Sequence, residues 1–280
     1  MNTLGYYNGN IDELENLTIP LLDRANYFGD GVYDVTYCRN YNIFALEEHI
    51  DRFFQSAALL KITPPLTKSE LSALLKSLVK RLDDGNQWVY FQLSRGTDLR
   101  NHAFPDQSVP ANLSVMLRPG EIRDTYLPLR CITRKDTRFL HCNAKSLNLL
   151  PNVLAKQAAT EAGADECILH RNGTVTECSH SNLFILKNGV MITHPANERI
   201  YAGTGRAHLL SLCKEKEIPT EERTFTLEEL MGADEVILTS ASALCMRIME
   251  IDGTHVGGKA SYTVKSLQDA LLEDYLSKTE

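Results

Sequence analysis

Apolar residues recur at helical spacing between positions 46 and 61. Leu46, Ile50, Phe53, Ala57 and Leu60 fall on one face of a helix, and the residues between them are mostly polar. This pattern predicts an amphipathic helix over residues 46–61 that packs its apolar face against a core.

A second helix is predicted directly after the first. Thr67 and Glu70 have the spacing of a capping box, in which each side chain accepts a hydrogen bond from the other residue's backbone N–H. The helix should end near Asp84-Gly85, and residues 88–94 then have the composition of a strand.

Three Asn-Gly turns between apolar segments predict β-hairpins. They are Asn8-Gly9, Asn172-Gly173 between residues 165–171 and 174–177, and Asn188-Gly189 between residues 182–187 and 190–194. The second half of the chain is therefore expected to be rich in hairpins.

Helices and strands alternate irregularly through the rest of the chain. Helices are predicted after Pro151, over 203–217, after the capping box at Thr226, and over 262–277, with a buried strand at 236–239. Residues 118–125 are polar and broken by Pro119-Gly120, which indicates a linker between a domain at 1–120 and a domain at 121–280. The pattern lacks regular βαβ alternation and favours a mixed α/β, α+β-like fold.

Composition and charge exclude several classes of protein. The net charge of -7 over 280 residues argues against non-specific nucleic-acid binding. No apolar run approaches the ~20 residues of a membrane span, and the N-terminus lacks the regions of a signal peptide. We therefore expect a cytoplasmic protein. The seven cysteines are scattered without a CxxC pair, so neither a disulfide framework nor a metal site is predicted.

Lys145 lies in an unusually apolar and amide-rich segment, residues 141–152. A desolvated lysine has a lowered pKa and becomes a usable amine nucleophile. The chemistry that most often needs such a lysine is a Schiff base with a carbonyl, above all with pyridoxal 5'-phosphate (PLP). A surface lysine before a helix is the alternative, and Lys145 alone does not decide between them.

Other segments carry residues that suit anion binding. His49 and Arg52 lie three apart on the first predicted helix, where Arg52 either binds an anion or pairs with Glu48. Residues 203–206 lie at the start of a predicted helix, where free backbone N–H groups can bind a phosphate. Two glycines before a helix can, however, also form an ordinary turn. The hydroxyl-rich segment 239–242 offers a second phosphate contact or a simple cap.

Two further features suit an amino acid substrate and its cofactor. Glu177 ends a predicted strand, where it either faces a protonated ring nitrogen or lies at the surface. Arg100 and His102 lie two apart in a loop and could together hold a carboxylate. The motifs of P-loop NTPases, α/β-hydrolases, zincins and dinucleotide-binding proteins are absent.

Four segments in this order resemble the fold-type IV PLP-dependent enzymes. They are residues 27–34, 48–52, 145–148 and 177–182. Within this family of branched-chain aminotransferases, D-amino acid aminotransferases and aminodeoxychorismate lyases, the loop 95–105 is most similar to the D-amino acid aminotransferases. The resemblance implies a smaller N-terminal α/β domain, a larger pseudo-barrel domain, and the cofactor PLP at their interface.

The resemblance also implies roles in cofactor binding. Lys145 would form the Schiff base and move the substrate α-proton, and Glu177 would pair with the pyridine nitrogen. Arg52, the turn formed by Gly203, Thr204 and Gly205, and the segment with Ser240 and Ala241 would hold the phosphate.

On the substrate side, the resemblance assigns Tyr33, Arg100, His102 and His180 to the pocket. Arg100 and His102 would reach over from the second subunit of a homodimer. His49 and Ser181 would support the residues that contact the substrate and the cofactor without touching either. The implied reaction moves an amino group between a D-amino acid of the D-alanine or D-glutamate type and a 2-oxo acid such as 2-oxoglutarate. An aminodeoxychorismate lyase, a branched-chain L-amino acid aminotransferase and a PLP-binding protein without turnover are the alternatives.

Four positions depart from the family pattern. Tyr201 replaces an expected aliphatic residue behind the cofactor ring, and His180 replaces a small residue beside the substrate. Gly205 and Ala241 remove two expected hydroxyl groups from the phosphate site. Because each lost hydrogen bond costs about 0.5–1.5 kcal/mol, we expect weaker cofactor retention.

Overall fold

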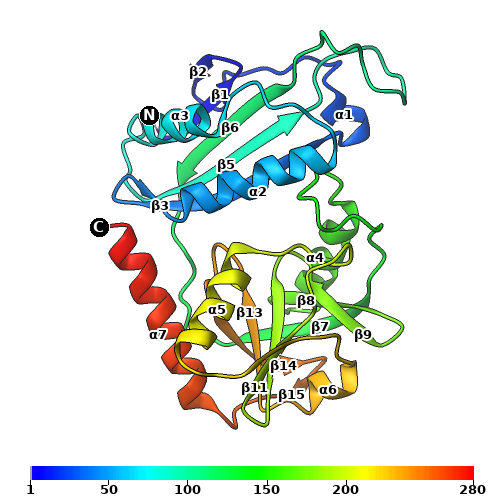
Figure 1. Cartoon of the computed structure of the whole chain (residues 1–280), viewed down its shortest axis with the longest axis vertical. Coiled ribbons are helices and arrows are strands. Elements are labelled where there is room, and N and C mark those ends of the chain that lie inside the picture. The colour runs from blue at the N-terminus through cyan, green and yellow to red at the C-terminus, as the bar shows by residue number, and fades with distance from the viewer. Residues whose placement is uncertain (1) are drawn as a thin grey trace. The chain divides into compact units, whose positions relative to one another are not determined.

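The computed structural model describes residues 2–280 and separates them into two compact units (Figure 1). The first unit extends to Glu121 and also includes Ala144–Asn148 and Ser277–Glu280. The second unit comprises Ile122–Asn143 and Leu149–Leu276.

The first unit is built on a six-stranded antiparallel sheet in the order β2-β1-β6-β5-β3-β4. The strands are β1 (Leu4–Tyr7), β2 (Asn10–Asp12), β3 (Gly31–Arg39), β4 (Asn42–Ile43), β5 (Gln87–Ser94) and β6 (Asn112–Pro119). The helices are α1 (Arg24–Phe28), α2 (Leu46–Leu59) and α3 (Lys68–Val79). Ile50 and Phe53 of α2, Leu75 of α3 and Phe91 of β5 are fully buried in one core, so the apolar face predicted for the first helix is confirmed.

The second unit is built on a nine-stranded mixed sheet in the order β12-β11-β10-β13-β14-β7-β8-β9, with β15 paired to β14. The strands are β7 (Leu129–Lys135), β8 (Glu166–Arg171), β9 (Thr174–Cys178), β10 (Asn182–Lys187), β11 (Val190–Thr193), β12 (Thr220–Glu222), β13 (Glu235–Thr239), β14 (Met246–Ile251) and β15 (Thr254–His255). The helices are α4 (Leu150–Glu161), α5 (Thr204–Glu215), α6 (Leu227–Met231) and α7 (Ser261–Lys278). Hairpins dominate the unit, but β7 pairs in parallel with both β8 and β14.

The predicted hairpins are all present. Asn8, Asn172 and Asn188 have φ angles of 46–51°, and each is followed by a glycine that also has positive φ. These left-handed conformations are what a tight two-residue hairpin turn requires. Together with the helices, they confirm the predicted mixed α/β class.

The capping boxes at Thr67 and Thr226 are also present, and each begins a helix. The first of these helices, α3, ends at Val79, however, and the prediction that it continues to Asp84-Gly85 is wrong. The side-chain amide of Gln87 donates to the carbonyl of Val79 (2.7 Å) and to that of Asp84 (2.6 Å). This buried amide satisfies a terminal helix carbonyl and so allows the chain to leave the helix early.

Candidate active site

The segment that carries Lys145 adds to the sheet of the first unit beside β3. Val32 and Ser146 form an antiparallel bridge. The N–H of Tyr33 donates to the carbonyl of Lys145 (3.0 Å), and the N–H of Leu147 donates to the carbonyl of Gly31 (3.0 Å). The backbone of Lys145 is thereby fixed on a rigid element.

The amine of Lys145 lies over an aromatic ring. Its Nζ is 4.4 Å from the ring centroid of Tyr33, and Tyr33 stacks in turn on Tyr90 at 5.6 Å. A cation over a ring face is attracted by the ring quadrupole. Lys145 is only partly exposed, so the structure places it in a partly desolvated aromatic setting, in contrast to a free surface lysine.

His49 and Arg52 converge on a buried carboxylate, that of Asp34. Arg52 donates to both carboxylate oxygens (2.7 and 2.8 Å), and His49 Nδ1 lies 2.8 Å from Oδ1. Although burial opposes ionisation, Arg52 and His49 hold the pKa of Asp34 well below its usual range. Burial lowers the pKa of His49, and the charges of Arg52 and Lys145 lower it further. Arg52 thus pairs with Asp34, which lies on β3 and was not singled out in the sequence.

Arg100 and His102 lie together against Phe28. The guanidinium carbon of Arg100 is 5.0 Å from the centroid of Phe28, and the ring of His102 is 5.1 Å from it. Both residues are exposed. The loop therefore presents two cationic or polar groups side by side, as the spacing predicted.

In the second unit, Glu177 is buried and held by several donors. The Arg138 guanidinium donates to its Oε1, and the N–H of Tyr201 donates to the carboxylate at 3.1 Å. Arg138 is itself held by Asp136 at 3.0 and 2.9 Å. Burial acts to lower the pKa of Arg138, but the charges of Glu177 and Asp136 outweigh burial and raise this pKa. A surface position for Glu177 is therefore excluded.

Arg138 and Asp136 were not predicted as site residues from the sequence. The available signal was their spacing of two residues, which places both side chains on the same side of an extended segment.

Asn182 joins Glu177 to the turn that opens α5. Its Nδ2 donates to Glu177 Oε2 (2.9 Å) and to the carbonyl of Tyr201 (2.7 Å). Its Oδ1 accepts from the N–H of Gly203 (3.0 Å). The two regions predicted to hold opposite ends of a cofactor are thus connected through one side chain.

The first turn of α5 packs closely against the segment after β13. A Cβ on Gly205 would lie 3.2 Å from the carbonyl oxygen of Ser240 and 3.4 Å from its nitrogen. The hydroxyl of Ser240 lies 3.3 Å from the hydroxyl of Ser242. Ala241, the residue between these two serines in the sequence, carries no hydroxyl group. Backbone N–H groups at a helix start, combined with hydroxyl groups, form a donor set suited to a phosphate.

His180 lies in the turn between β9 and β10 and contacts a buried glutamate. Its Nδ1 is 2.8 Å from Oε2 of Glu166, and the Ser181 hydroxyl donates to the same oxygen at 3.3 Å. Glu166 is 1% exposed, whereas the His180 side chain is 51% exposed. Glu166 was also missed from the sequence, because a lone strand-start glutamate gives no local sign of burial.

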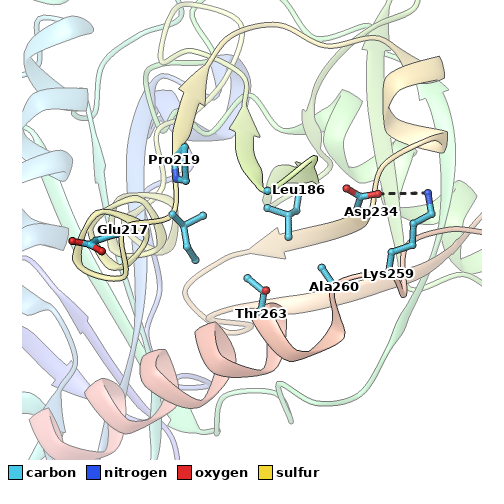
Figure 2. A pocket seen from close by; sticks show the side chains of 9 residues that line it. Leu186, Glu217, Pro219, Asp234, Lys259, Ala260 and Thr263 are labelled. Atoms are coloured by element: carbon cyan, nitrogen blue, oxygen red, sulfur yellow. Dashed lines mark ion pairs between the residues drawn. The ribbon is translucent and has the colours of Figure 1, made fainter.

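A surface hollow of about 440 Å³ in the second unit contains none of the predicted site residues (Figure 2). It is lined partly by Leu186, Pro219 and Thr263, and at its edge Lys259 pairs with Asp234 at 3.5 Å. Within residues 2–280, no cluster of three or more His, Cys, Asp or Glu side chains could hold a metal ion. No helix in the same range is long and apolar enough to cross a membrane.

Comparison with known proteins identifies relatives along nearly the whole chain. A D-alanine aminotransferase of Listeria monocytogenes is 38% identical over 283 residues, covering 95% of this chain and 94% of the relative. The D-alanine aminotransferase of Bacillus licheniformis is also 38% identical and covers 98% and 97%, respectively.

Solved structures have the same fold. The T.th. branched-chain amino acid aminotransferase, complexed with N-(5'-phosphopyridoxyl)-L-glutamate, matches with a TM-score of 0.88 at 26% identity, covering 99% of this chain and 94% of that one. The Escherichia coli branched-chain amino acid aminotransferase matches with a TM-score of 0.89 at 21% identity, over 100% and 96%. These matches confirm the predicted fold-type IV architecture.

The model of the class IV amino-transferase family matches residues 31–251, a range that contains Lys145, Glu177 and the α5 turn. Enzymes of this family use PLP, so the predicted cofactor and the predicted enzyme class are both confirmed. The chain belongs to the class IV aminotransferase family.

Proposed function

We propose that the protein is a PLP-dependent transaminase that moves the amino group between a D-amino acid and a 2-oxo acid such as 2-oxoglutarate. The proposed preference for D-amino acids rests on one observation. Curated relatives at 36–40% identity over nearly the whole chain are named D-alanine aminotransferases. The branched-chain enzymes reported above share the fold at only 21–26% identity.

The residues of the second unit fit PLP. Buried Glu177 offers a carboxylate to a pyridinium nitrogen, and the N–H groups of Thr204 and Gly205 with the hydroxyl of Ser240 suit a phosphate. The glycine at 205 leaves room for the close approach of α5 to Ser240. When bound, PLP supplies an aldehyde for Schiff-base chemistry and a ring that accepts electrons.

Residues of the first unit supply the nucleophile and its surroundings. We assign Lys145 Nζ as the amine that bonds to the cofactor and accepts the substrate α-proton, with Tyr33 beside it. The assignment of Arg52 to the phosphate is also retained. Its paired Asp34 keeps the guanidinium oriented, with His49 behind it.

We assign substrate carboxylate binding to Arg100 and His102. Their common packing on Phe28 supports this role, because it brings a guanidinium and an imidazole to one exposed edge. His180 and Ser181, in the turn after Glu177, stay in the proposed substrate region as a pocket residue and a supporting residue, respectively.

We further propose a homodimer, supported by the reversed polarity of α4. Leu150, Val153 and Leu154 are 58–69% exposed, whereas its buried residues are the small Ala155 and Ala159. Large apolar side chains exposed together on one helix are typical of a surface that binds another protein chain. The same proposal has Arg100 and His102 complete the active site of the neighbouring subunit.

We also propose that the protein is located in the cytoplasm. All seven cysteines are free thiols among the described residues, and six of them are buried. Reduced cysteines in this number suit a reducing compartment.

The reaction is tested with purified protein, D-alanine and 2-oxoglutarate. We expect pyruvate and D-glutamate to form together. Turnover of L-leucine without D-alanine would instead indicate a branched-chain enzyme. Release of pyruvate from aminodeoxychorismate without an amino acceptor would indicate a lyase, and failure with every substrate would leave only PLP binding.

The carboxylate assignment is tested with Arg100→Ala. Charge-assisted hydrogen bonds contribute about 1.5–3 kcal/mol, so we expect the KM for D-alanine to rise roughly tenfold to a hundredfold. Reaction with amines that lack a carboxylate should not change. Arg118→Ala is the matched control, because Arg118 is also an exposed arginine on an aromatic ring, 4.7 Å from Trp88. Equal effects of Arg100→Ala on both kinds of amine would refute the assignment.

A further inference from the structure

Asn182 occupies a buried position between two regions of the proposed cofactor site. It is 5% exposed, begins β10, and pairs in register with Thr239 of β13, the residue before Ser240. Its amide contacts Glu177, the carbonyl of Tyr201 and the N–H of Gly203.

The chemistry of these three neighbours fixes the orientation of the amide. A carboxylate and a backbone carbonyl only accept hydrogen bonds, whereas a backbone N–H only donates. Nδ2 must therefore face Glu177 and Tyr201, and Oδ1 must face Gly203. Aspartate lacks the donor and leucine lacks both groups, so an asparagine amide suits the site where these residues do not.

The backbone of Gly203 lies close against this amide. Gly203 has φ -73° and ψ 152°, a conformation open to any residue. A Cβ at this position would nevertheless lie 2.5 Å from Oδ1 of Asn182. Glycine is therefore required here for space and not for backbone geometry, and the space is taken by Asn182.

We propose that Asn182 is a positioning residue that holds the Glu177 carboxylate and the N-terminal turn of α5 in one fixed relation. In this arrangement the ring nitrogen of the cofactor can contact Glu177 while its phosphate contacts the N-terminal turn of α5. This proposal rests on the proposed PLP-dependent function. It predicts that the loss of Asn182 weakens cofactor binding at both ends of the molecule.

Two substitutions separate the contact with Glu177 from the contact with the turn that opens α5. Asn182→Ala removes all three hydrogen bonds, and we expect the Kd for PLP to rise roughly tenfold to a hundredfold, by analogy with the loss of metal affinity when a residue that orients metal ligands is removed. Asn182→Asp keeps an acceptor for Gly203 but places a second carboxylate against Glu177. Because like charges favour protonation of one partner, we expect the pH titration of the bound cofactor's absorption spectrum to shift in this variant.

Asn112→Ala provides the matched control in the first unit. Asn112 is 7% exposed, donates to Asp23 (2.8 Å) and Thr97 (2.9 Å), and accepts from Asn8 (2.9 Å). Like Asn182→Ala, Asn112→Ala therefore loses two donated side-chain hydrogen bonds and one accepted one. We expect a lower Tm in both alanine variants but a weaker PLP Kd only in Asn182→Ala.

The Kd is measured by quenching of protein fluorescence when PLP is added to the apoprotein, and the spectrum is titrated on the loaded protein. If the wild type fails to bind PLP, the proposed function fails. If the wild type binds PLP and Asn182→Ala binds it equally well, only the positioning role is overturned. An unshifted titration in Asn182→Asp also overturns it, because a purely structural asparagine predicts that result.

Discussion

Tyr33 and Lys145 contact each other through both their backbones and their side chains. The N–H of Tyr33 donates to the carbonyl of Lys145 at 3.0 Å, and Lys145 Nζ lies 4.4 Å from the Tyr33 ring centroid. The chain positions of the two residues are more than a hundred apart. A strand of the core sheet therefore fixes both the backbone and the amine of the proposed nucleophile.

The first prediction separates the charge of Lys145 from its reactivity. Lys145→Arg keeps a cation that can lie over the Tyr33 ring, but a guanidinium does not act as an amine nucleophile. We expect the free energy of unfolding to change by less than about 1 kcal/mol. Borohydride reduction in the presence of PLP should leave a phosphopyridoxyl group on the wild type, seen as a mass increase, and not on the variant.

Lys80→Arg is the control for this experiment, because Lys80 is an exposed lysine at the end of α3. It should be labelled like the wild type. A stable borohydride-reduced adduct in Lys145→Arg would mean that another lysine is the reactive amine.

The second prediction concerns Arg138, which lies between two buried carboxylates. Arg138→Met removes the Arg138 guanidinium from both Glu177 and Asp136, while Asp136 keeps its ion pair with Arg171. Breaking a buried ion pair costs about 3–5 kcal/mol, because the remaining buried charge loses that partner. We expect a loss of that size in urea unfolding, together with weaker PLP binding.

Arg171→Met tests whether the effect passes through Glu177. Arg171 also pairs with Asp136, at 3.1 Å, but its side chain is 25% exposed, whereas Arg138 donates to both Asp136 and Glu177. This variant should lose less stability and should keep its PLP affinity. Equal losses of PLP affinity in the two variants would show that Asp136, and not Glu177, determines the effect.

The third prediction concerns the missing hydroxyl groups of the phosphate site. Ala241→Ser adds one beside Ser240, and a neutral hydrogen bond contributes about 0.5–1.5 kcal/mol. We expect PLP to bind roughly two- to tenfold more tightly. Gly205→Ala should act in the opposite direction, because its Cβ would lie 3.2 Å from the carbonyl oxygen of Ser240. Unchanged or weaker affinity in Ala241→Ser would contradict this account of the departure from the family pattern.

Features defined by neighbouring residues could be predicted from the sequence. Asn172 and Asn188 adopt the left-handed conformation that their Asn-Gly turns indicate, and Thr67 and Thr226 form the expected capping boxes. In each case the hydrogen bonds or dihedral angles involve residues within a few positions of one another.

Features that depend on tertiary contacts could not be predicted in the same way. The pairing of Val32 with Ser146 joins distant segments, and neither segment indicates its partner. For Arg52, the sequence suggested a pair with Glu48 on the same helix and gave no sign of the pair with Asp34 on a neighbouring strand that the structure shows. The end of α3 likewise depends on Gln87, whose amide reaches back to Val79.

The fourth prediction concerns His180, which departs from the small residue expected at its position. Its Nδ1 lies 2.8 Å from buried Glu166, which also accepts hydrogen bonds from the hydroxyl groups of Ser179 and Ser181. Burial raises the pKa of Glu166, but the contacts with His180 and Ser179 outweigh burial and lower it from its usual value of 4.5. A carboxylate with a depressed pKa in the folded state adds stability above its unfolded pKa and loses that contribution as the pH falls through the folded value.

His180→Ser should therefore destabilise the protein at pH 7 by about 1–2 kcal/mol, less than for a fully buried pair because half of the imidazole is exposed to solvent. As the pH falls from 4.5 towards the lowered pKa of Glu166, the difference in the free energy of unfolding should shrink. Urea unfolding at pH 7, 5.5, 4 and 3 measures this difference. In a Glu166→Gln background, His180→Ser should have little effect at any of these pH values, because the charge that His180 contacts is gone. A difference that is independent of pH and persists in the Glu166→Gln background would mean that His180 stabilises the turn by packing alone.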